Sequence, residues 1–339
     1  MNSFKTGILL VNLGTPDSPA VPDVRKYLVE FLMDKRVIDI PSVQRNLLVR
    51  GIIAPFRAPK SAALYKKIWT EKGSPLLVYS QQLKEKLQNR LGENYMVELA
   101  MRYQSPSIEN GLNKLRENNC GRLIVMPLFP QYASASNGSV VDKVMEITKN
   151  WQAFPDLHIT GSFHNHELFI KAFAEKGRNY HPENYDHILF SFHGLPERQI
   201  TKSVPQNNCL SENCCDTLHA KNQFCYCAQC FDTARLIAAE LNIPKEKYTV
   251  CFQSRLGKTP WIKPYSDNVI DELAQKGIKN ILAFSPAFVA DCLETIYEIG
   301  VEYNDIFKSK GGEKITLVES LNDSDLFVDC LVELQAAGR

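Results

Sequence analysis

Hydrophobic and polar positions along this chain follow two alternating patterns. Short apolar runs that end at glycine, proline or polar residues are typical of buried parallel strands. Between them lie segments whose apolar residues recur every three or four positions, as on one face of a helix. Val21–Met33 is such a segment, with apolar side chains at positions 24, 27, 28 and 31. The clearest apolar run begins at Ile188 and stops at His193 and Gly194.

The order of these segments predicts the fold class. Alternating strands and helices imply βαβ crossovers and parallel sheets covered on both faces, which is an α/β protein. The pattern repeats in each half, so we expect two doubly wound parallel-sheet lobes, residues 1–163 and 164–339, with a cleft between them. Strands are expected at 7–13, 96–101, 122–129, 158–161, from 188, 248–253, 280–284 and 315–318, and helices at 21–33, 81–91, 107–118, 138–151, 167–180, 231–241, 267–276, 291–302 and 325–334.

One apolar segment fits neither pattern. Leu47–Phe56 is interrupted by Arg50, Gly51 and Pro55, so we expect no continuous helix there. It is either an edge of the core or an exposed apolar lip for a greasy ligand or a membrane surface. The residues alone slightly favour the core.

Composition excludes several classes of protein. The 339 residues are 44% hydrophobic, with a net charge of +1, and nucleic-acid-binding surfaces normally carry clustered basic excess. The N-terminus is expected to be a first strand and not a signal peptide, and no apolar run reaches the roughly 18 residues of a spanning helix. We therefore expect a cytosolic protein, whose ten cysteines are thiols or metal ligands because that compartment is reducing.

Candidate chemistry lies at the ends of the expected strands, where open α/β sheets bind their ligands. His193 ends one strand, although a structural hydrogen bond to a loop is the simpler interpretation of a single histidine. Asp291, Glu294 and Glu298 share one face of an expected helix in an apolar segment. They are suited to pass on a divalent cation or accept protons; a solvated acidic face is the alternative. Arg102 is either a carboxylate-binding group or a surface arginine.

The cysteines carry a stronger signal. Six of the ten lie in one short segment, and four thiolates suffice to hold a tetrahedral zinc ion or a two-iron cluster. Spacing alone does not separate these two metals. Adjacent Cys214 and Cys215 project differently, so only one of them is expected to be a ligand. Four further cysteines stand singly and are expected to be small buried side chains: Cys120, Cys251, Cys292 and Cys330.

Taken together, the motifs resemble the ferrochelatase family almost from end to end. SFHGLP (191–196) and DCLET (291–295) are specific, and the others are weaker: VNLGTP (11–16), GSPL (73–76), MRY (101–103), FPQY (129–132), FQSRLGKTPW (252–261) and ESLN (319–322). The resemblance implies two Rossmann-like lobes around a porphyrin cleft. It also implies insertion of Fe²⁺ into protoporphyrin IX to form protohaem, with release of two protons.

The resemblance also implies roles for single residues. His193 corresponds to the family's catalytic histidine and Glu294 to its partner carboxylate, both binding iron or accepting protons, with Asp291 and Glu298 on a metal or proton path. Leu13 stands where the coproporphyrin branch has tyrosine, which favours protoporphyrin as the substrate. The expected porphyrin-binding residues are Leu13, Arg57, Ser74, Arg102, Tyr103, Tyr132, Trp261 and Phe288.

Two departures from the animal enzymes concern the cysteines. Those enzymes place one cluster cysteine where Ser134 stands and three near the C-terminus, where this chain has only Cys330. Cys292 replaces a histidine beside the acidic residues, which leaves no histidine role there. We therefore expect a [2Fe-2S] cluster, with structural zinc as the alternative, and Cys227 as a spare thiol. The expected ligands are four of Cys209, Cys214, Cys215, Cys225 and Cys230.

The resemblance also bears on partners. It favours the exposed lip for Leu47–Phe56, and with it a cytoplasmic protein in peripheral contact with the inner face of the membrane. The expected small-molecule partners are protoporphyrin IX and ferrous iron. A chelatase for another tetrapyrrole or metal is the nearest alternative, and a haem- or metal-binding carrier or sensor is the alternative from a different class.

Overall fold

The computed structural model describes residues 5–204, 209–210, 213–255, 257 and 259–337, which form two compact units. The first contains Met1–Phe129, Ser134–Gly161 and Val328–Arg339, and the second contains Pro130–Ala133 and Ser162–Phe327. These units differ from the two lobes expected from the sequence, 1–163 and 164–339, mainly at the C-terminus. There, Asp329 of α12 (Asp325–Ala337) makes an ion pair with Arg90 of α4 (Pro75–Leu91), which joins the end of the chain to the first unit.

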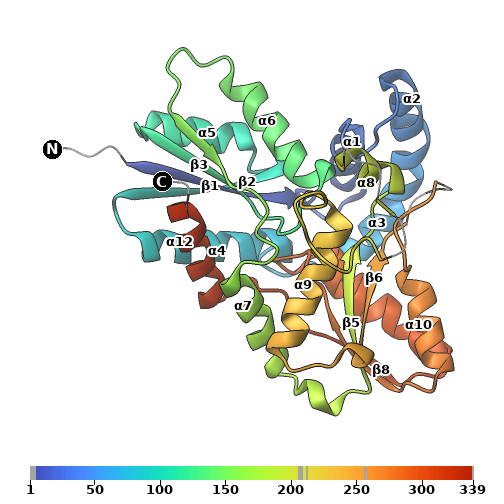
Figure 1. Ribbon diagram of the computed structural model, residues 1–339. Coiled ribbons are helices and arrows are strands. Elements are labelled where there is room, and N and C mark those ends of the chain that lie inside the picture. The colour runs from blue at the N-terminus through green and yellow to red at the C-terminus, as the bar shows by residue number, and fades with distance from the viewer. Residues whose placement is uncertain (1–4, 205–208, 211–212, 256, 258, 338–339) are drawn as a thin grey trace. The chain divides into compact units, whose positions relative to one another are not determined.

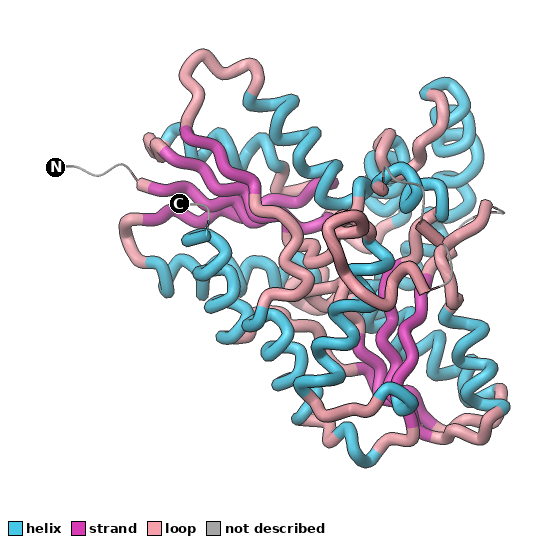
Figure 2. The backbone as a smooth tube through the Cα atoms, in the orientation of Figure 1, coloured by secondary structure: helices cyan, strands magenta, loops and turns pink. Residues whose placement is uncertain are grey.

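A four-stranded parallel sheet forms the centre of the first unit, in the order β2-β1-β3-β4 (Figures 1 and 2). Leu9 of the first strand pairs in register with Val125, and both lie in a buried cluster with Leu112 and Val140 from two covering helices. The bounds are β1 (Thr6–Gly14), β2 (Tyr95–Tyr103), β3 (Arg122–Pro127), β4 (Asp156–Ile159), α1 (Val21–Met33), α5 (Ile108–Glu117), η2 (Ser134–Gly138) and α6 (Ser139–Thr148).

The segment expected to be broken is instead helical throughout. It consists of the π-helix η1 (Leu47–Ile53) and the first residues of α3 (Ala54–Ile68), and it directly follows α2 (Ser42–Asn46). Our expectation was wrong because the fixed φ of proline is compatible with a helix, and the chain continues from η1 through Pro55 at the expense of one backbone hydrogen bond. Leu47 is 72% exposed and Phe56 is 73% exposed, so this segment is an exposed lip and not a core edge.

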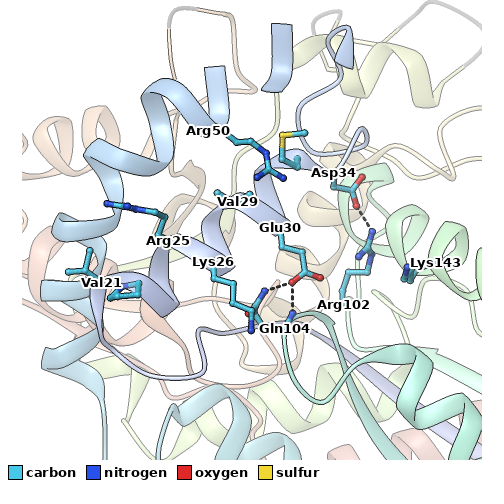
Figure 3. Close-up of a pocket in the computed structure, with 12 residues that line it drawn as sticks. Val21, Arg25, Lys26, Val29, Glu30, Asp34, Arg50, Arg102, Gln104 and Lys143 are labelled. Carbon is cyan, nitrogen blue, oxygen red and sulfur yellow. Dashed lines mark hydrogen bonds and ion pairs between the residues drawn. The ribbon is translucent and has the colours of Figure 1, made fainter. Parts of the chain in front are cut away.

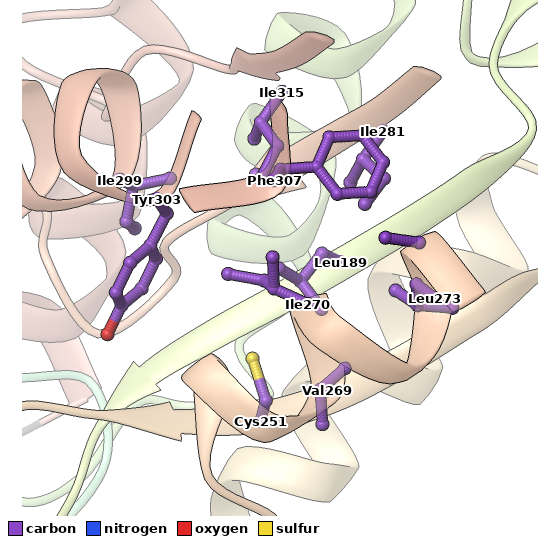
Figure 4. Close-up of a cluster of buried hydrophobic side chains, with 12 residues drawn as sticks. Leu189, Cys251, Val269, Ile270, Leu273, Ile281, Ile299, Tyr303, Phe307 and Ile315 are labelled. Carbon is purple, nitrogen blue, oxygen red and sulfur yellow. The ribbon is translucent and has the colours of Figure 1, made fainter. Parts of the chain in front are cut away.

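The second unit repeats the topology of the first. Its parallel sheet has the order β6-β5-β7-β8, and its core includes Leu189, Ile270, Ile281 and Phe307 (Figure 4). Its elements are α7 (Glu167–Arg178), η3 (Pro182–Asn184), β5 (His187–His193), α8 (Glu197–Ser203), α9 (Tyr226–Glu240), η4 (Lys245–Lys247), β6 (Tyr248–Gln253), α10 (Ser266–Gln275), β7 (Asn280–Phe284), η5 (Leu293–Tyr303), α11 (Asn304–Ser309) and β8 (Lys314–Leu317).

This topology confirms the predicted α/β, doubly wound fold and determines where the chemistry of the second unit lies. The chain runs from β5 to β6 on one side of β5 and then to β7 on its other side. The carboxyl end of β5 is therefore the switch point of the sheet, where ligand-binding crevices form. The segments that follow β5, β6 and β7 all emerge at this edge. The predicted cleft between the lobes concerns the placement of the two units and stays a prediction.

Three local expectations need correction. The acidic segment is not an α-helix from residue 291 but the π-helix η5, which begins at Leu293, after Asp291. In a π-helix the hydrogen bonds join residues five apart, so the pattern of side chains on one face changes. The helices α4 and α9 begin several residues before the predicted starts, and α8 was not predicted.

Across the part of the chain that is described, no helix combines the length and apolarity that crossing a membrane requires.

Candidate active site

His193 stands at the carboxyl end of β5 with one ring nitrogen already used. Its Nδ1 lies 2.7 Å from the carbonyl oxygen of Gly194. Because a carbonyl only accepts hydrogen bonds, Nδ1 carries the proton, and the lone pair of the neutral ring is on Nε2. The Tyr226 hydroxyl donates to the His193 carbonyl oxygen at 2.8 Å, which fixes the backbone of this strand end. The imidazole is thus held with a defined basic nitrogen.

Two predicted pocket residues lie against this strand end. The Phe288 ring meets the His193 ring edge to face, with the centroids 6.5 Å apart. A Cβ atom on Gly194 would stand 2.8 Å from the carbonyl oxygen of Gln253 and 3.3 Å from Cε3 of Trp261. Glycine is therefore required there, because it lets Trp261 and the neighbouring strand approach closely. The structure places Trp261 and Phe288 beside the strand end that carries His193, and their contact with a porphyrin stays a prediction.

Glu298 lies at the same edge and receives three hydrogen-bond donors. Gln253 Nε2 donates to Oε2 at 3.0 Å, and the Tyr303 hydroxyl donates to Oε1 at 3.1 Å. The Ser254 hydroxyl lies 2.9 Å from Oε1 and 2.7 Å from Oε2. Burial raises the pKa of the Glu298 carboxyl, and the hydrogen bond from Ser254 acts in the opposite direction. Sequence reasoning missed these donors, because nothing local in the pattern links them to residue 298.

Glu294 belongs to the same neighbourhood. Its carbonyl oxygen accepts a hydrogen bond from Gln253 Nε2 at 3.2 Å. The pKa of Glu298 is lowered by the charge of His193 and raised by that of Glu294, so all three groups interact electrostatically. Burial, followed by the charge of Glu294, raises the pKa of the Cys292 thiol, which keeps that thiol neutral.

Asp291 differs from Glu294 and Glu298 because its side chain is buried. Its Oδ1 accepts from the Thr295 hydroxyl at 3.0 Å and from the backbone N–H of Ser320 at 3.2 Å. Its Oδ2 accepts from Asn322 Nδ2 at 2.9 Å. The side chain therefore ties the ESLN motif to the start of η5, and it is not part of a solvated acidic face.

In the first unit, Arg102 and Tyr103 converge on a carboxylate that the sequence did not single out. Arg102 Nη2 lies 2.7 Å from Asp34 Oδ2, and the Tyr103 hydroxyl donates to the same oxygen at 3.0 Å. Ser139 Oγ donates to it as well. Tyr103 has no exposed surface, and burial together with the charge of Asp34 raises the pKa of its hydroxyl. The carboxylate that Arg102 binds in this structure is therefore Asp34.

A pocket of about 880 Å³ lies beside this ion pair (Figure 3). Val29 and Met33 of α1 line it, together with Arg102 and with Arg50 of the exposed lip. Lys143 adds another positive charge. The pocket thus combines apolar surface with cationic groups, and the carboxylates of Glu30 and Asp34 also line it.

The remaining predicted porphyrin contacts are divided between the units. Leu13 is half-buried at the end of β1, and Ser74 is buried, with its Oγ accepting from the Thr15 hydroxyl at 2.9 Å. Arg57 is exposed on α3. Tyr132 belongs to the second unit, where its backbone N–H donates to a glutamine side chain of α9 at 2.6 Å. Leu13 and Ser74 therefore accompany Arg102 at the carboxyl edge of the first sheet.

The predicted cysteine ligands meet mainly as pairs. The Sγ atoms of Cys209 and Cys225 are 3.5 Å apart, and those of Cys214 and Cys215 are 3.6 Å apart. Hydrogen bonds from Cys209 and Cys215 lower the pKa of the Cys225 thiol. Cys227 also lies within hydrogen-bonding reach of Cys215. Two thiolates on one tetrahedral zinc lie about 3.8 Å apart, so these separations are compatible with a shared metal.

The described residues of this segment contain no ready-made metal site. Among the residues that the structure describes, no group of three or more His, Cys, Asp or Glu side chains is arranged to hold a metal ion. Cys230 is fully buried on α9, next to Tyr226. The segment thus supplies the donor type that an iron–sulfur or zinc site needs, with Cys215 and Cys225 each in contact with more than one other thiol. The four single cysteines are buried, as predicted: Cys120, Cys251, Cys292 and Cys330.

Comparison with known proteins first gives the class of protein. Superposition on the solved structure "SirB from Bacillus subtilis with Fe3+" covers 99% of this chain and 98% of the SirB chain. The TM-score is 0.51 and the sequence identity is 13%. At this identity the likeness concerns the fold alone, which is the two-sheet α/β architecture described above.

The particular family follows from closer relatives. Residues 5–338 match the ferrochelatase family. The ferrochelatase of Legionella pneumophila is 48% identical over 320 residues, which are 94% of this chain and 95% of the relative. That of Coxiella burnetii is 44% identical over 338 residues, 98% and 94% of the two chains. The chain belongs to the ferrochelatase family, the metal-inserting lyases of haem biosynthesis. Its reaction is the insertion of ferrous iron into protoporphyrin.

Proposed function

We propose that His193 and Glu294 carry the insertion of Fe²⁺ into protoporphyrin IX. The observation that carries this assignment is the hydrogen bond from His193 Nδ1 to the Gly194 carbonyl oxygen, which leaves Nε2 as the basic nitrogen at the switch point of the sheet. Insertion releases two pyrrole protons, and imidazole is the side chain that ordinarily titrates nearest neutral pH. Imidazole and carboxylate also suit Fe²⁺ without retaining it as thiolates would.

The other acidic residues have separate roles in this proposal. Glu298 lies within electrostatic range of His193 and Glu294, so it is suited to take up protons or to pass on iron. Asp291 is buried under three hydrogen bonds, and its contribution is to hold the start of η5 in place. The metal or proton path would thus run through Glu298, with Asp291 supporting it.

The proposed porphyrin contacts form two sets, one in each unit. Trp261 and Phe288 beside His193 provide aromatic surface for the macrocycle. In the first unit, Leu13, Arg57, Ser74 and Arg102 are the proposed contacts, with Tyr103 acting through Arg102 because it is fully buried. Tyr132 completes the proposed set. The aliphatic Leu13 favours protoporphyrin, so kcat/KM should be higher for protoporphyrin than for coproporphyrin, and the reverse ranking would contradict this role.

The cysteine segment would hold a [2Fe-2S] cluster, or a structural zinc ion as the alternative. The support is the donor set: thiols are the ligands of both groups, and Cys209, Cys215 and Cys225 lie within hydrogen-bonding reach of one another in pairs. Cys230 is the fourth proposed ligand, and Cys214 is the alternative to Cys215. Either group, when bound, would cross-link this loop to α9. Arg235 of α9 already donates to the Cys215 carbonyl oxygen at 3.1 Å.

The exposed lip would place the protein at a membrane surface on the cytoplasmic side. Its apolar side chains are unusually accessible: Leu47 is 72% exposed, Ile52 54% and Phe56 73%, and Val43 of the preceding α2 is 78% exposed. Exposed apolar patches of this kind mark membrane or partner contacts. Such a contact would suit a substrate as apolar as protoporphyrin.

Replacing the histidine tests the assignment. His193→Ala should abolish haem formation, followed anaerobically by the haem absorption spectrum, while porphyrin binding measured by fluorescence is retained. The reason is that the variant loses the basic nitrogen but keeps the apolar surfaces. His181→Asn is the matched control, since His181 is an exposed histidine of the same unit whose positive φ asparagine tolerates. Near-normal turnover in His193→Ala would refute the assignment.

A further inference from the structure

The hydrogen bonds around Glu298 leave its carboxylate almost, but not fully, satisfied. A carboxylate offers about four lone-pair positions. Gln253, Ser254 and Tyr303 each supply one hydrogen to it, because the Ser254 hydroxyl has a single proton although it lies close to both oxygens. Among the residues that the structure describes, three donated hydrogens on four positions leave one acceptor position for a proton or a cation.

The side chain of Gln253, which donates to Glu298, makes two further hydrogen bonds. The second Nε2 hydrogen of Gln253 goes to the carbonyl oxygen of Glu294, and its Oε1 accepts from the Ser191 hydroxyl at 2.7 Å. Ser191 lies on β5, two residues before His193, and therefore on the same face of the sheet. This chain of hydrogen bonds joins Glu298 to the strand that carries His193.

The serine donor is held by its backbone. Ser254 directly follows β6 and has a φ of 67°, in the left-handed region that residues other than glycine seldom occupy. Such strain persists where the surrounding structure requires it and is concentrated at functional sites. Here the strained conformation accompanies a hydroxyl within 2.9 Å of both Glu298 oxygens.

The tyrosine donor depends on the π-helix. Tyr303 follows Glu298 by five residues, which is the hydrogen-bonding period of η5, so its side chain returns to the face that carries Glu298. Tyr303 is 7% exposed, and its ring belongs to the core cluster of the second unit (Figure 4). In an α-helix, residues four apart would share this face and Tyr303 would point elsewhere.

We propose that Tyr303 and Ser254 are positioning residues, which hold the Glu298 carboxylate in one orientation with a single acceptor position open. This rests on the proposed site, in which Glu298 takes protons or iron beside His193. Tyr303 and Ser254 touch neither substrate in this scheme and act only through Glu298. The species received at the open position is a pyrrole proton or the substrate Fe²⁺.

Tyr303→Phe removes one hydroxyl and leaves the ring in the core. We expect kcat/KM for Fe²⁺ to fall about tenfold, as for the loss of a hydrogen bond to a charged group, with the KM for protoporphyrin unchanged. In the Glu298→Gln background the same change should cost less than about twofold, because residues that act through one group are not additive. Tyr248→Phe, a buried tyrosine at the opposite end of β6, is the matched control and should leave both constants unchanged.

Ser254→Gly separates positioning from stability. Glycine adopts the positive φ without strain, so the melting temperature should stay the same or rise, while kcat/KM for Fe²⁺ falls. A parallel loss of stability and activity would indicate a merely structural serine and overturn its part of the proposal. Equal losses from Tyr303→Phe with and without Glu298→Gln, or a Glu298→Gln enzyme of full activity, would overturn the proposal as a whole. An active His193→Ala enzyme would instead refute the site itself.

Discussion

Asp34 offers the sharpest test of how the first unit holds its cationic pocket. Its side chain is 6% exposed, and Oδ2 receives Arg102, Tyr103 and Ser139. Asp34→Asn keeps the size and one oxygen acceptor but removes the charge. Arg102, with a side chain 14% exposed, would then keep its neutral partner Ser139 and lose its only carboxylate partner among the described residues.

The size of the effect follows from this burial. Removing one partner of a buried ion pair costs about 3–5 kcal/mol, because the remaining charge stays desolvated. Asparagine can still accept one hydrogen bond and Ser139 still faces Arg102, so we expect the lower end, about 3 kcal/mol. Asp142→Asn is the control: Asp142 also pairs with an arginine, Arg36, but its side chain is 34% exposed. Solvent screening should limit that loss to about 1 kcal/mol.

Equilibrium urea unfolding measures both variants. Because the chain has two compact units, the transition that involves the first unit should be analysed separately from the other. The Asp34→Asn loss should exceed the Asp142→Asn loss by about 2 kcal/mol. If the two variants lose the same stability, or Asp34→Asn loses less than the control, then Asp34 does not hold a desolvated charge and the reasoning fails.

Three other expectations can be checked independently. Glu294→Gln should lower kcat about a hundredfold in the anaerobic haem assay by removing a charge at the reaction centre, and Asp291→Asn should lower it much less; equal effects would contradict the separate roles. Cys225→Ser should bleach the visible absorption expected of the purified protein, whereas Cys251→Ser in the core should not, and a colourless protein that contains zinc would replace the cluster by a zinc site. Burial lowers the pKa of His187 from 6.5 to about 4, so the unfolded chain binds more protons between these values. Acidification from pH 7 to 5 should therefore cost about 2 kcal/mol of stability. In His187→Gln this loss of stability on acidification should be absent, as measured by urea unfolding.

The local pattern of apolar and polar residues was sufficient to predict most of the helices and strands. The apolar spacing of Val21–Met33 predicted α1 to the residue, and β6 and β7 were predicted with the same accuracy. Periods of two and 3.6 residues arise from backbone geometry, so they can be read from neighbouring residues. Because parallel strands must alternate with crossovers, this order of elements also placed His193 at a carboxyl edge.

The same local pattern could not distinguish a π-helix from an α-helix. The apolar and acidic positions around Glu294 fit a 3.6-residue period, and the extra residue per hydrogen-bonded ring leaves little trace in one short segment. This difference decides a contact at the site, because Tyr303 reaches Glu298 only with the five-residue hydrogen-bonding period of the π-helix. At Pro55, similarly, the helix continues from η1 into α3, although the local pattern indicated a break there.

The sequence by itself determined the residue types of the site and the sheet edge on which they stand. Only the tertiary structure decided which side chains meet. Asp34 is 68 residues from Arg102, and Glu298 is 44 residues from Ser254. Such pairs are brought together by the order of strands in the two sheets, and no local period records that order. Burial then gives each pair its strength, because a hydrogen bond or charge withdrawn from water must be matched within the protein.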